Sequence, residues 1–228
     1  MEPSTIIPST IPPKALQTRT RIKVCGITKF SEALLIAQQG VDSLGLVFHP
    51  KSPRFIGLDS ARKIRDAMPP FVTITALFMD EAEEWIEQVL STINPDCLQF
   101  HGDESEADCV RWKQPYIKSI SMGSTVNVEA YAAQYPSAQG FLFDSNAVGL
   151  QGGSGDTFDW SKIPLSFDRP LLLAGGLNPS NVADAVTQVR PWCVDVSSGV
   201  EISKGLKDLN LINQFFQEVV RGDANARL

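Results

Sequence analysis

The sequence lacks several features that would place it in common protein classes. It has four cysteines in 228 residues and no C-x-x-C pair, so it does not indicate a disulfide-dense secreted scaffold, and we expect reduced thiols. No apolar run approaches the roughly 20 residues that span a bilayer. Positive charge is also scarce, because the formal net charge is −6. This charge argues against nucleic acid or an anionic membrane as a partner, although one Arg and local dipoles can still bind a small anion.

Residues 1–20 differ in composition from the rest of the chain. Residues 1–13 are rich in Pro, Ser and Thr, and they lack the apolar core flanked by basic residues that a secretory signal needs. An organellar transit peptide is a weaker alternative, because Glu2 and the absence of an amphipathic pattern count against it. We therefore expect residues 1–20 to be a poorly ordered extension and the protein to be cytoplasmic.

After residue 20, short apolar runs alternate with longer amphipathic segments. Most of the apolar runs are continuous, which is typical of parallel strands covered on both faces. The expected strands are residues 22–25, 43–48, 72–78, 97–100, 116–121, 140–144, 170–174 and 193–197. The expected helices are residues 31–39, 59–67, 81–90, 104–112, 178–186 and 208–219, with weaker helical segments after Ser121 and Asp159.

Eight strands, each followed by a helical segment, predict an α/β protein with a parallel sheet. Eight such units fit a closed (β/α)8 TIM barrel better than an open sheet, and a hydrophobic content of 43% is enough for its core. No linker interrupts the repeat, so we expect residues 21–228 to form one barrel domain. In such barrels the active site lies at the carboxyl ends of the strands, and the residues at those ends are therefore the candidates.

Three glycine-bearing turns lie late in the chain, at residues 152–155, 175–176 and 197–199. Glycine lets the backbone approach a ligand closely, and successive backbone N–H groups form a site for an anion. The second and third turns follow the seventh and eighth expected strands, where barrels commonly bind phosphate. The alternative is that these glycines only shape tight turns. No turn completes a P-loop or a dinucleotide-binding motif, so a nucleotide cofactor is not indicated.

Cys25 and Asp144 end the first and sixth expected strands. Taken alone, such a Cys is more often a buried structural thiol, and such an Asp is more often a helix cap or a loop anchor. At the mouth of a barrel, however, a thiolate can abstract a proton, and a carboxyl group in apolar surroundings can donate one. A pair of this kind suits an isomerisation that moves a proton, and the sequence shows no cofactor signature.

Arg54 and His101 are further polar candidates near strand ends. A guanidinium group can bind a carboxylate through two parallel hydrogen bonds, although a solvated surface Arg is the default interpretation. His101 could be a neutral hydrogen-bonding group at the site or could support another residue there. No His or Cys cluster at metal-ligand spacing accompanies it, which argues against a zinc site. The acidic residues around positions 81–84 and 103–106 are expected to favour helix N-termini.

Together these motifs resemble the phosphoribosylanthranilate isomerase family. They occur in the order of that family over about residues 21–220, so the series is far more specific than any one motif. The motifs are KVCGIT at 23–28, GLVF at 45–48, SPR at 52–54, QFHG at 99–102, FDS at 143–145, GGSG at 152–155, FDW at 158–160, AGGLNP at 174–179 and DVSSGVE at 195–201.

The resemblance implies a phosphate-binding (β/α)8 barrel that catalyses a cofactor-free Amadori rearrangement in tryptophan biosynthesis. The substrate would be N-(5-phosphoribosyl)anthranilate, and the product 1-(2-carboxyphenylamino)-1-deoxyribulose 5-phosphate. By analogy, Asp144 is the general acid that opens the furanose ring, and Cys25 is the general base at C2′. Arg54 would hold the anthranilate carboxylate, and His101 would line the site. The implied phosphate-binding backbone groups are those of Gly153, Gly176, Ser198 and Gly199.

Two alternative functions are weighed against this one. The related sugar isomerase of histidine biosynthesis performs the same Amadori chemistry, but its acid and base are both Asp, so Cys25 argues against it. A noncatalytic barrel that binds a phosphorylated ligand would have lost the proton-transfer pair, whereas both members are present. We expect a small phosphorylated substrate as the partner and a monomeric chain, with a dimer as the alternative.

Overall fold

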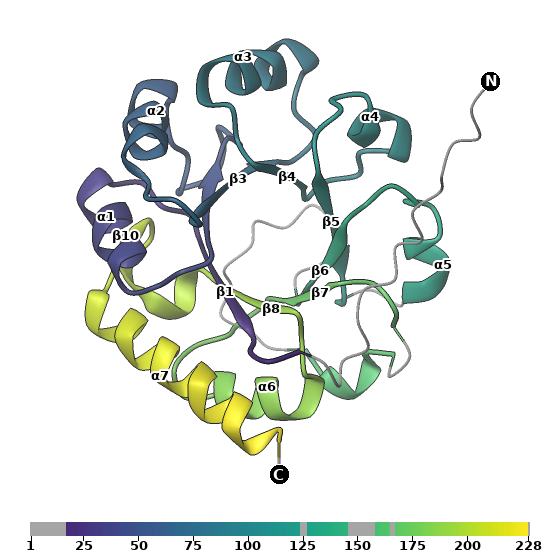
Figure 1. The fold of residues 1–228 in the computed structure, drawn as a ribbon. Coiled ribbons are helices and arrows are strands. Elements are labelled where there is room, and N and C mark those ends of the chain that lie inside the picture. The colour runs from purple at the N-terminus through teal and green to yellow at the C-terminus, as the bar shows by residue number, and fades with distance from the viewer. Residues whose placement is uncertain (1–16, 124–126, 146–157, 165–166, 228) are drawn as a thin grey trace, which may run out of the picture.

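Eight parallel strands close into a barrel in the order in which they occur along the chain (Figure 1). The computed structural model describes residues 17–123, 127–145, 158–164 and 167–227. The strands are β1 (Arg21–Cys25), β2 (Ser43–Val47), β3 (Thr73–Phe78), β4 (Cys97–Phe100), β5 (Tyr116–Ser121), β6 (Gly140–Asp144), β7 (Leu171–Leu173) and β8 (Cys193–Val196). The expected α/β fold with a (β/α)8 barrel is therefore confirmed.

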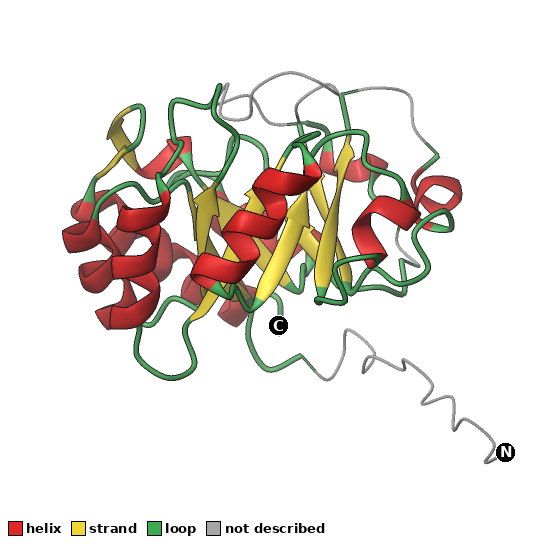
Figure 2. Ribbon diagram, turned by 90° about the horizontal axis from the view of Figure 1, so that it is seen from above, coloured by secondary structure: helices red, strands yellow, loops and turns green. Residues whose placement is uncertain are grey.

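The helices form a ring outside the barrel, as Figures 1 and 2 show. Each α-helix buries apolar side chains on one face and leaves its polar face to solvent, which is the reason for the amphipathic pattern between the strands. The helices are α1 (Phe30–Gln38), α2 (Leu58–Ala67), α3 (Glu83–Ile93), α4 (Glu106–Val110), α5 (Val128–Ala132), η2 (Trp160–Lys162), α6 (Val182–Val189), η3 (Ser198–Val200) and α7 (Leu209–Asn225).

Several element boundaries differ from those expected, for local reasons. The helix expected from Ser31 begins at Phe30, and no side chain caps it. The helix expected from residue 104 begins at Glu106, because Ser105 and Asp108 form a reciprocal capping box. The last helix is longer than expected and begins after Asp208, whose carboxylate accepts from two backbone N–H groups.

A short antiparallel ribbon follows β8 and was not expected. It consists of β9 (Glu201–Ser203) and β10 (Leu206–Lys207). Thr28 Oγ1 donates to the Gly205 carbonyl, 2.6 Å away, and so ties the ribbon to the loop after β1. Figure 2 shows the ribbon beside the barrel, at the end where the loops after the strands lie. The ribbon therefore belongs to the face of the barrel that carries the candidate site.

The strands bury side chains on both faces, and the two faces carry different residues. One face packs against the surrounding helices, and this packing forms the main hydrophobic core. The other face points into the barrel, where a small apolar cluster of Leu142, Leu172, Ala174 and Cys193 fills the interior. Because side chains alternate along a strand, Cys25 and Asp144 share the inward face with this cluster and lie above it.

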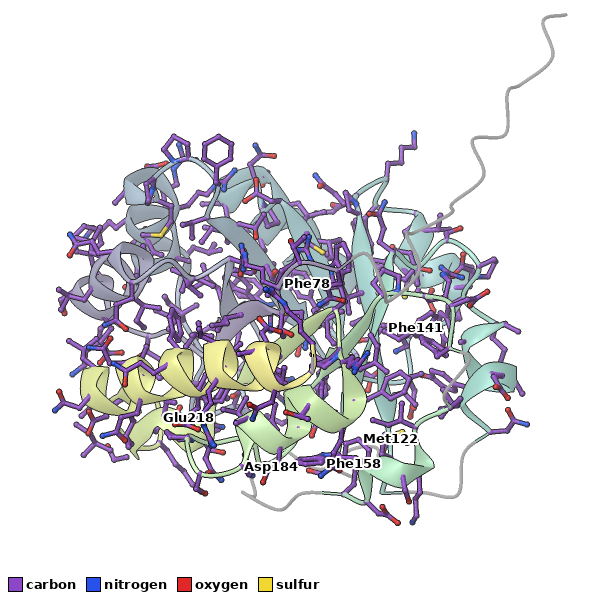
Figure 3. The ribbon with its side chains drawn as sticks, turned by 60° about the horizontal axis from the view of Figure 1, so that its bottom comes forward. Phe78, Met122, Phe141, Phe158, Asp184 and Glu218 are labelled. Carbon is purple, nitrogen blue, oxygen red and sulfur yellow. The ribbon has the colours of Figure 1, made fainter. Side chains whose placement is uncertain are left out.

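A row of aromatic rings crosses the outer face of four neighbouring chain segments. Phe48 stacks on Phe78, Phe78 contacts Phe100, and Phe100 meets Tyr116 edge-on, with ring centroids about 6 Å apart at each step. All four side chains are almost fully buried. Figure 3 shows Phe78 and Phe141 among the strands, whereas Glu218 lies on α7.

Glu104 corrects the expectation that the acidic residues at 103–106 serve helix N-termini. Its buried carboxylate forms an ion pair with Lys118 on β5, at 2.7 Å. It also accepts hydrogen bonds from the backbone N–H groups of Asp80 and Gly102. Glu104 therefore joins the loops after β3 and β4, and only Asp108 and Glu106 remain in the first turn of α4.

The described chain begins at residue 17, so residues 1–16 of the expected extension lie outside the described residues. Residues 17–20 contact the barrel. Thr20 is buried, and its backbone N–H and its hydroxyl both donate to the Asp223 carboxylate of α7, with the hydroxyl 2.7 Å away. These bonds attach the segment before β1 to the last helix.

The aromatic row gives a prediction about stability. Phe100→Ala removes a fully buried ring and should lower the free energy of unfolding by about 3–5 kcal/mol, measured by urea denaturation. Phe71 is the matched control, because its ring is 100% exposed. Phe71→Ala should change the free energy of unfolding by less than about 0.5 kcal/mol. Equal effects of the two substitutions would contradict the assignment of Phe100 to the core.

Candidate active site

A cavity of about 780 Å³, including its open mouth, lies at the carboxyl ends of the strands. Parallel barrels place their sites there because the loops after the strands converge at that end. The lining residues come from seven of the eight strands or the loops that follow them. They include six sequence candidates: Cys25, Arg54, His101, Asp144, Gly176 and Ser198. Residues far apart in the sequence thus share one small chamber.

Cys25 is the last residue of β1, and its thiol is buried at the cavity wall. The neighbouring position on β2 is Gly45, where a Cβ atom would lie only 2.7 Å from Sγ of Cys25. Glycine is therefore required beside the thiol. Burial raises the pKa of Cys25, whereas the Lys23 ammonium group lowers it and Asp195 raises it further. A thiolate at this position depends on the cations around it.

Lys23 and Asp195 form an ion pair inside the barrel, with Nζ and Oδ1 3.0 Å apart. They are register partners on β1 and β8, and both are buried. Burial disfavours the charge on Lys23, but Asp195 outweighs this effect and raises the Lys23 pKa. Lys23 precedes Cys25 by two positions, so both side chains point to the inner face and the cation lies next to the thiol.

Asp144 is the last residue of β6, and it lines the cavity together with His101. Nε2 of His101 lies 3.5 Å from Oδ2 of Asp144. On the other side of the ring, Nε2 of Gln99 lies 3.2 Å from Nδ1 of His101 and can donate to it. That bond leaves the proton of a neutral His101 on Nε2, directed toward the carboxyl group. His101 thus lines the cavity, as expected, and contacts the candidate acid.

Arg54 lies in the loop after β2, and its buried side chain crosses the chain at Gly26. A Cβ atom at Gly26 would lie 2.4 Å from Cδ of Arg54, and Gly26 has a φ of 77°. Both facts explain why glycine follows Cys25. Nε and Nη2 of Arg54 each donate to a different oxygen of Glu201, at 2.8 Å. Arg54 is therefore held in a fixed orientation and is not the solvated surface residue of the default interpretation.

The two glycine turns after β7 and β8 pack against each other. A Cβ atom at Gly199 would lie 1.9 Å from the Leu177 carbonyl oxygen, so only glycine permits this approach. Gly176 has a φ of 63° and lines the cavity with Ser198. Gly199 lies beside the cavity, against Leu177. The fourth candidate phosphate-binding residue, Gly153, lies outside the described residues.

Sequence reasoning assigned no role to several charged residues that the structure brings to this site. Glu201 and Lys207 belong to the β9–β10 ribbon. His49 at the cavity wall pairs with Glu81, with 2.5 Å between Nδ1 and Oε1. This pair corrects the expectation that Glu81 serves a helix N-terminus, because α3 begins at Glu83 and only Glu83 and Glu84 lie in its first turn. The pair of Lys23 and Asp195 did leave a signal, because each interrupts an otherwise apolar strand. A charged residue within a buried strand indicates an internal partner.

The described residues also give three results about metal binding, membrane spans and cysteines. Among them, no group of three or more His, Cys, Asp or Glu side chains is arranged to hold a metal ion. No helix in the described part of the chain is long and apolar enough to cross a membrane. All four cysteines fall within the described ranges and are free thiols.

The fold and the cavity define a class: a (β/α)8-barrel enzyme with a thiol and a carboxyl group at one site and glycine turns after β7 and β8. A family model described as N-(5′phosphoribosyl)anthranilate (PRA) isomerase matches residues 22–218. The chain belongs to this isomerase family.

Individual relatives agree with this assignment. An N-(5′-phosphoribosyl)anthranilate isomerase from Pseudomonas fluorescens is 47% identical over 199 residues, covering 87% of this chain and 98% of the relative. The crystal structure of phosphoribosyl anthranilate isomerase from Thermotoga maritima is 37% identical, with a TM-score of 0.79, and the match covers 91% of this chain and 98% of that one. A further crystal structure of this isomerase, in complex with reduced 1-(o-carboxyphenylamino)-1-deoxyribulose 5-phosphate, has a TM-score of 0.77 at 37% identity and covers 88% and 98%.

The ion pair beside the thiol gives a prediction about its titration. Lys23→Met removes the cation that favours the thiolate, so the pKa of Cys25 should rise. Alkylation of Cys25 by iodoacetamide should then require a higher pH than in the wild type, measured as the rate against pH. Lys29→Met, at an exposed position near the same end of the barrel, should leave the profile unchanged. An unshifted profile in Lys23→Met would show that this cation does not act on the thiol.

Proposed function

We propose that this chain catalyses the Amadori rearrangement of N-(5-phosphoribosyl)anthranilate to 1-(2-carboxyphenylamino)-1-deoxyribulose 5-phosphate, a step of tryptophan biosynthesis. The observation that carries the proposal is the meeting of Cys25 and Asp144 at one cavity, with Arg54 and the glycine turns at its rim. Membership of the isomerase family supports the same reaction. The chain acts as a monomer in the cytoplasm.

Two proton transfers divide the reaction between the two candidate catalytic residues. Asp144 donates a proton to the furanose ring oxygen, and the ring opens to a Schiff base between C1′ and the anthranilate nitrogen. Cys25, as the thiolate, removes the proton from C2′, and the electrons of that C–H bond form an enolamine. The enolamine tautomerises to the ketone, so no net oxidation occurs and the steps use no redox cofactor. His101 lies where it can hydrogen-bond Asp144 and keep it oriented.

The two charged ends of the substrate bind at opposite sides of the reacting carbons. The Arg54 guanidinium holds the anthranilate carboxylate, because Arg binds carboxylates in a fixed geometry. Backbone N–H groups of Gly153, Gly176, Ser198 and Gly199 bind the phosphate, which suits the positive ends of peptide dipoles at such turns. Binding at both ends fixes the sugar between acid and base, which removes much of the entropy cost of the reaction.

The main rival reaction is the Amadori rearrangement of histidine biosynthesis, whose enzyme uses Asp as both acid and base. Cys25 stands at the wall of this cavity, against Gly45, where the rival would need a carboxylate. A thiol in place of that carboxylate favours the tryptophan-pathway substrate.

Substitution of the two proton-transfer residues tests the proposal. Cys25→Ala and Asp144→Asn should each lower kcat by about 100- to 10,000-fold, the usual contribution of general acid or base catalysis. The assay follows the loss of anthranilate fluorescence from substrate formed in situ. Cys109→Ala is the matched control, because Cys109 is another buried free thiol, and this variant should keep its activity. A wild type that does not turn over the substrate would disprove the function. Full activity in Cys25→Ala would disprove the assignment of Cys25 as the general base.

Arg54 gives a second test, which concerns binding. Arg54→Lys keeps the charge but loses the two-pronged geometry, so KM for the substrate should rise about tenfold, as expected for one lost charge-assisted hydrogen bond. The change in kcat should be smaller, because the carboxylate lies away from the reacting carbons. Arg62→Lys, in an exposed ion pair on α2, is the control and should leave KM unchanged. Equal KM values for wild type and Arg54→Lys would show that Arg54 does not bind the substrate carboxylate.

A further inference from the structure

One buried carboxylate, that of Glu201, lies between two cations at the edge of the cavity. Its Oε1 lies 2.8 Å from Nε of Arg54 and 2.8 Å from Nζ of Lys207, and its Oε2 lies 2.8 Å from Nη2 of Arg54. The side chains of all three residues are less than a tenth exposed. Such charge-assisted hydrogen bonds in a dry environment hold the side chains in one arrangement.

Lys207 extends this contact to the phosphate-binding turn. Its ammonium group donates to the Ser197 carbonyl oxygen at 3.1 Å and lies 3.4 Å from Oγ of the same residue. Ser197 immediately precedes Ser198 and Gly199, and its carbonyl also accepts from the Val200 N–H, at 3.4 Å. The three donor positions of the ammonium group are thus directed at Glu201 and Ser197, so its place is set by both.

The β9–β10 ribbon brings Glu201 and Lys207 to this position. The two residues are register partners across the ribbon, so their side chains share one face of it. At the ribbon turn, a Cβ atom at Gly205 would lie 3.0 Å from the Pro53 carbonyl, one residue before Arg54. The Thr28 hydroxyl holds the same turn from the loop after β1. The ribbon therefore contacts the loop that carries Arg54 at two places: Glu201 bonds to Arg54, and Gly205 packs against Pro53.

The charges of the cluster do not cancel. Burial raises the pKa of Glu201, but the bonds from Arg54 and Lys207 outweigh burial and lower it, so the group is a carboxylate at neutral pH. Glu201 in turn outweighs burial and raises the pKa of Arg54. Burial lowers the pKa of Lys207, and Glu201 opposes this effect. With both cations charged, the cluster has an excess of one positive charge, which suits an anionic ligand beside it.

We propose that Glu201 is a positioning residue that holds both ends of the substrate site, Arg54 directly and the turn at Ser198 and Gly199 through Lys207. The inference rests on the proposed function, in which these groups bind the carboxylate and the phosphate. One carboxylate then sets the distance between the two binding groups. Loss of its charge disturbs both ends, although Glu201 itself does not contact the substrate.

The main experiment compares Glu201→Gln with a matched control at the other end of the barrel. Asp96 accepts two hydrogen bonds from Arg65, at 2.6 and 2.8 Å, so Asp96→Asn also breaks a two-pronged Arg–carboxylate pair. Glu201→Gln should raise the dissociation constant of the reduced product analogue about tenfold, the equivalent of one charge-assisted hydrogen bond. Asp96→Asn should leave that constant unchanged, even if both variants unfold at lower urea concentrations. Equal affinities for wild type and Glu201→Gln would overturn the proposal.

Two small ligands, each corresponding to one end of the substrate, test the two ends of the site separately. With anthranilate and inorganic phosphate as competitive inhibitors, Arg54→Lys should weaken inhibition by anthranilate alone, and Lys207→Met should weaken inhibition by phosphate alone. Glu201→Gln should weaken both, and weakening of only one would overturn the link between the ends. A wild type that neither turns over the substrate nor binds the analogue would overturn the proposed function and this inference with it. If the wild type binds the analogue and the Glu201→Gln variant binds it with the same affinity, only this inference is overturned.

Discussion

The pairing of β1 with β8 closes the barrel, and the arrangement of the site depends on it. The register places Lys23 opposite Asp195 and Val24 opposite Val196. A slip of one residue would turn the inward side chains of one strand to the helix face, so the register decides which groups meet inside the barrel. Closure also removes the exposed edges that an open sheet would present. The strand that carries the thiol thus meets the strand that leads into the last glycine turn.

Several buried charged groups in the described part of the chain form ion pairs or a triad. Lys23 pairs with Asp195, Lys118 with Glu104, and Glu201 with two cations. Buried pairs of this kind contribute little net stability, because the loss of hydration offsets much of the attraction. Their contribution here is geometric, since each joins different strands or loops of the structure. The apolar contacts stabilise the barrel, whereas the ion pairs connect two strands inside it and fix loops at its mouth.

The sequence was informative about the fold because hydrophobic periodicity reports burial directly. Continuous apolar runs marked all eight barrel strands within a few residues, and the rule that sites follow strand ends then selected Cys25, Asp144 and Arg54. The roles of these residues came from the resemblance to a family, since position alone also suits a core thiol or a helix cap. The candidate at Gly153 lies outside the described residues.

The partners of the charged residues could not be read from the sequence. Arg54 and Glu201 are 147 positions apart, and no periodic pattern relates them. Glu104 was expected at a helix N-terminus because its acidic neighbours suit one, but its carboxylate forms an ion pair with Lys118 on β5. The sequence did not predict the β9–β10 ribbon, because its strands are too short to show an alternation of apolar and polar residues. Long-range contacts of this kind follow from the closed topology and not from local composition.

The absence of a side chain at Gly45 has a stereochemical consequence. Sγ of Cys25 rests against the backbone of β2, and any larger residue there would displace it. The sulfur therefore has one direction of approach to a molecule bound in the cavity. If Cys25 is the base and the sugar is fixed at both ends, as proposed, the sugar would present a single face to that sulfur and would lose its hydrogen from that face alone. The stereochemical course of the reaction would then depend on glycine at position 45 of the neighbouring strand, where even the methyl group of an alanine would displace the sulfur.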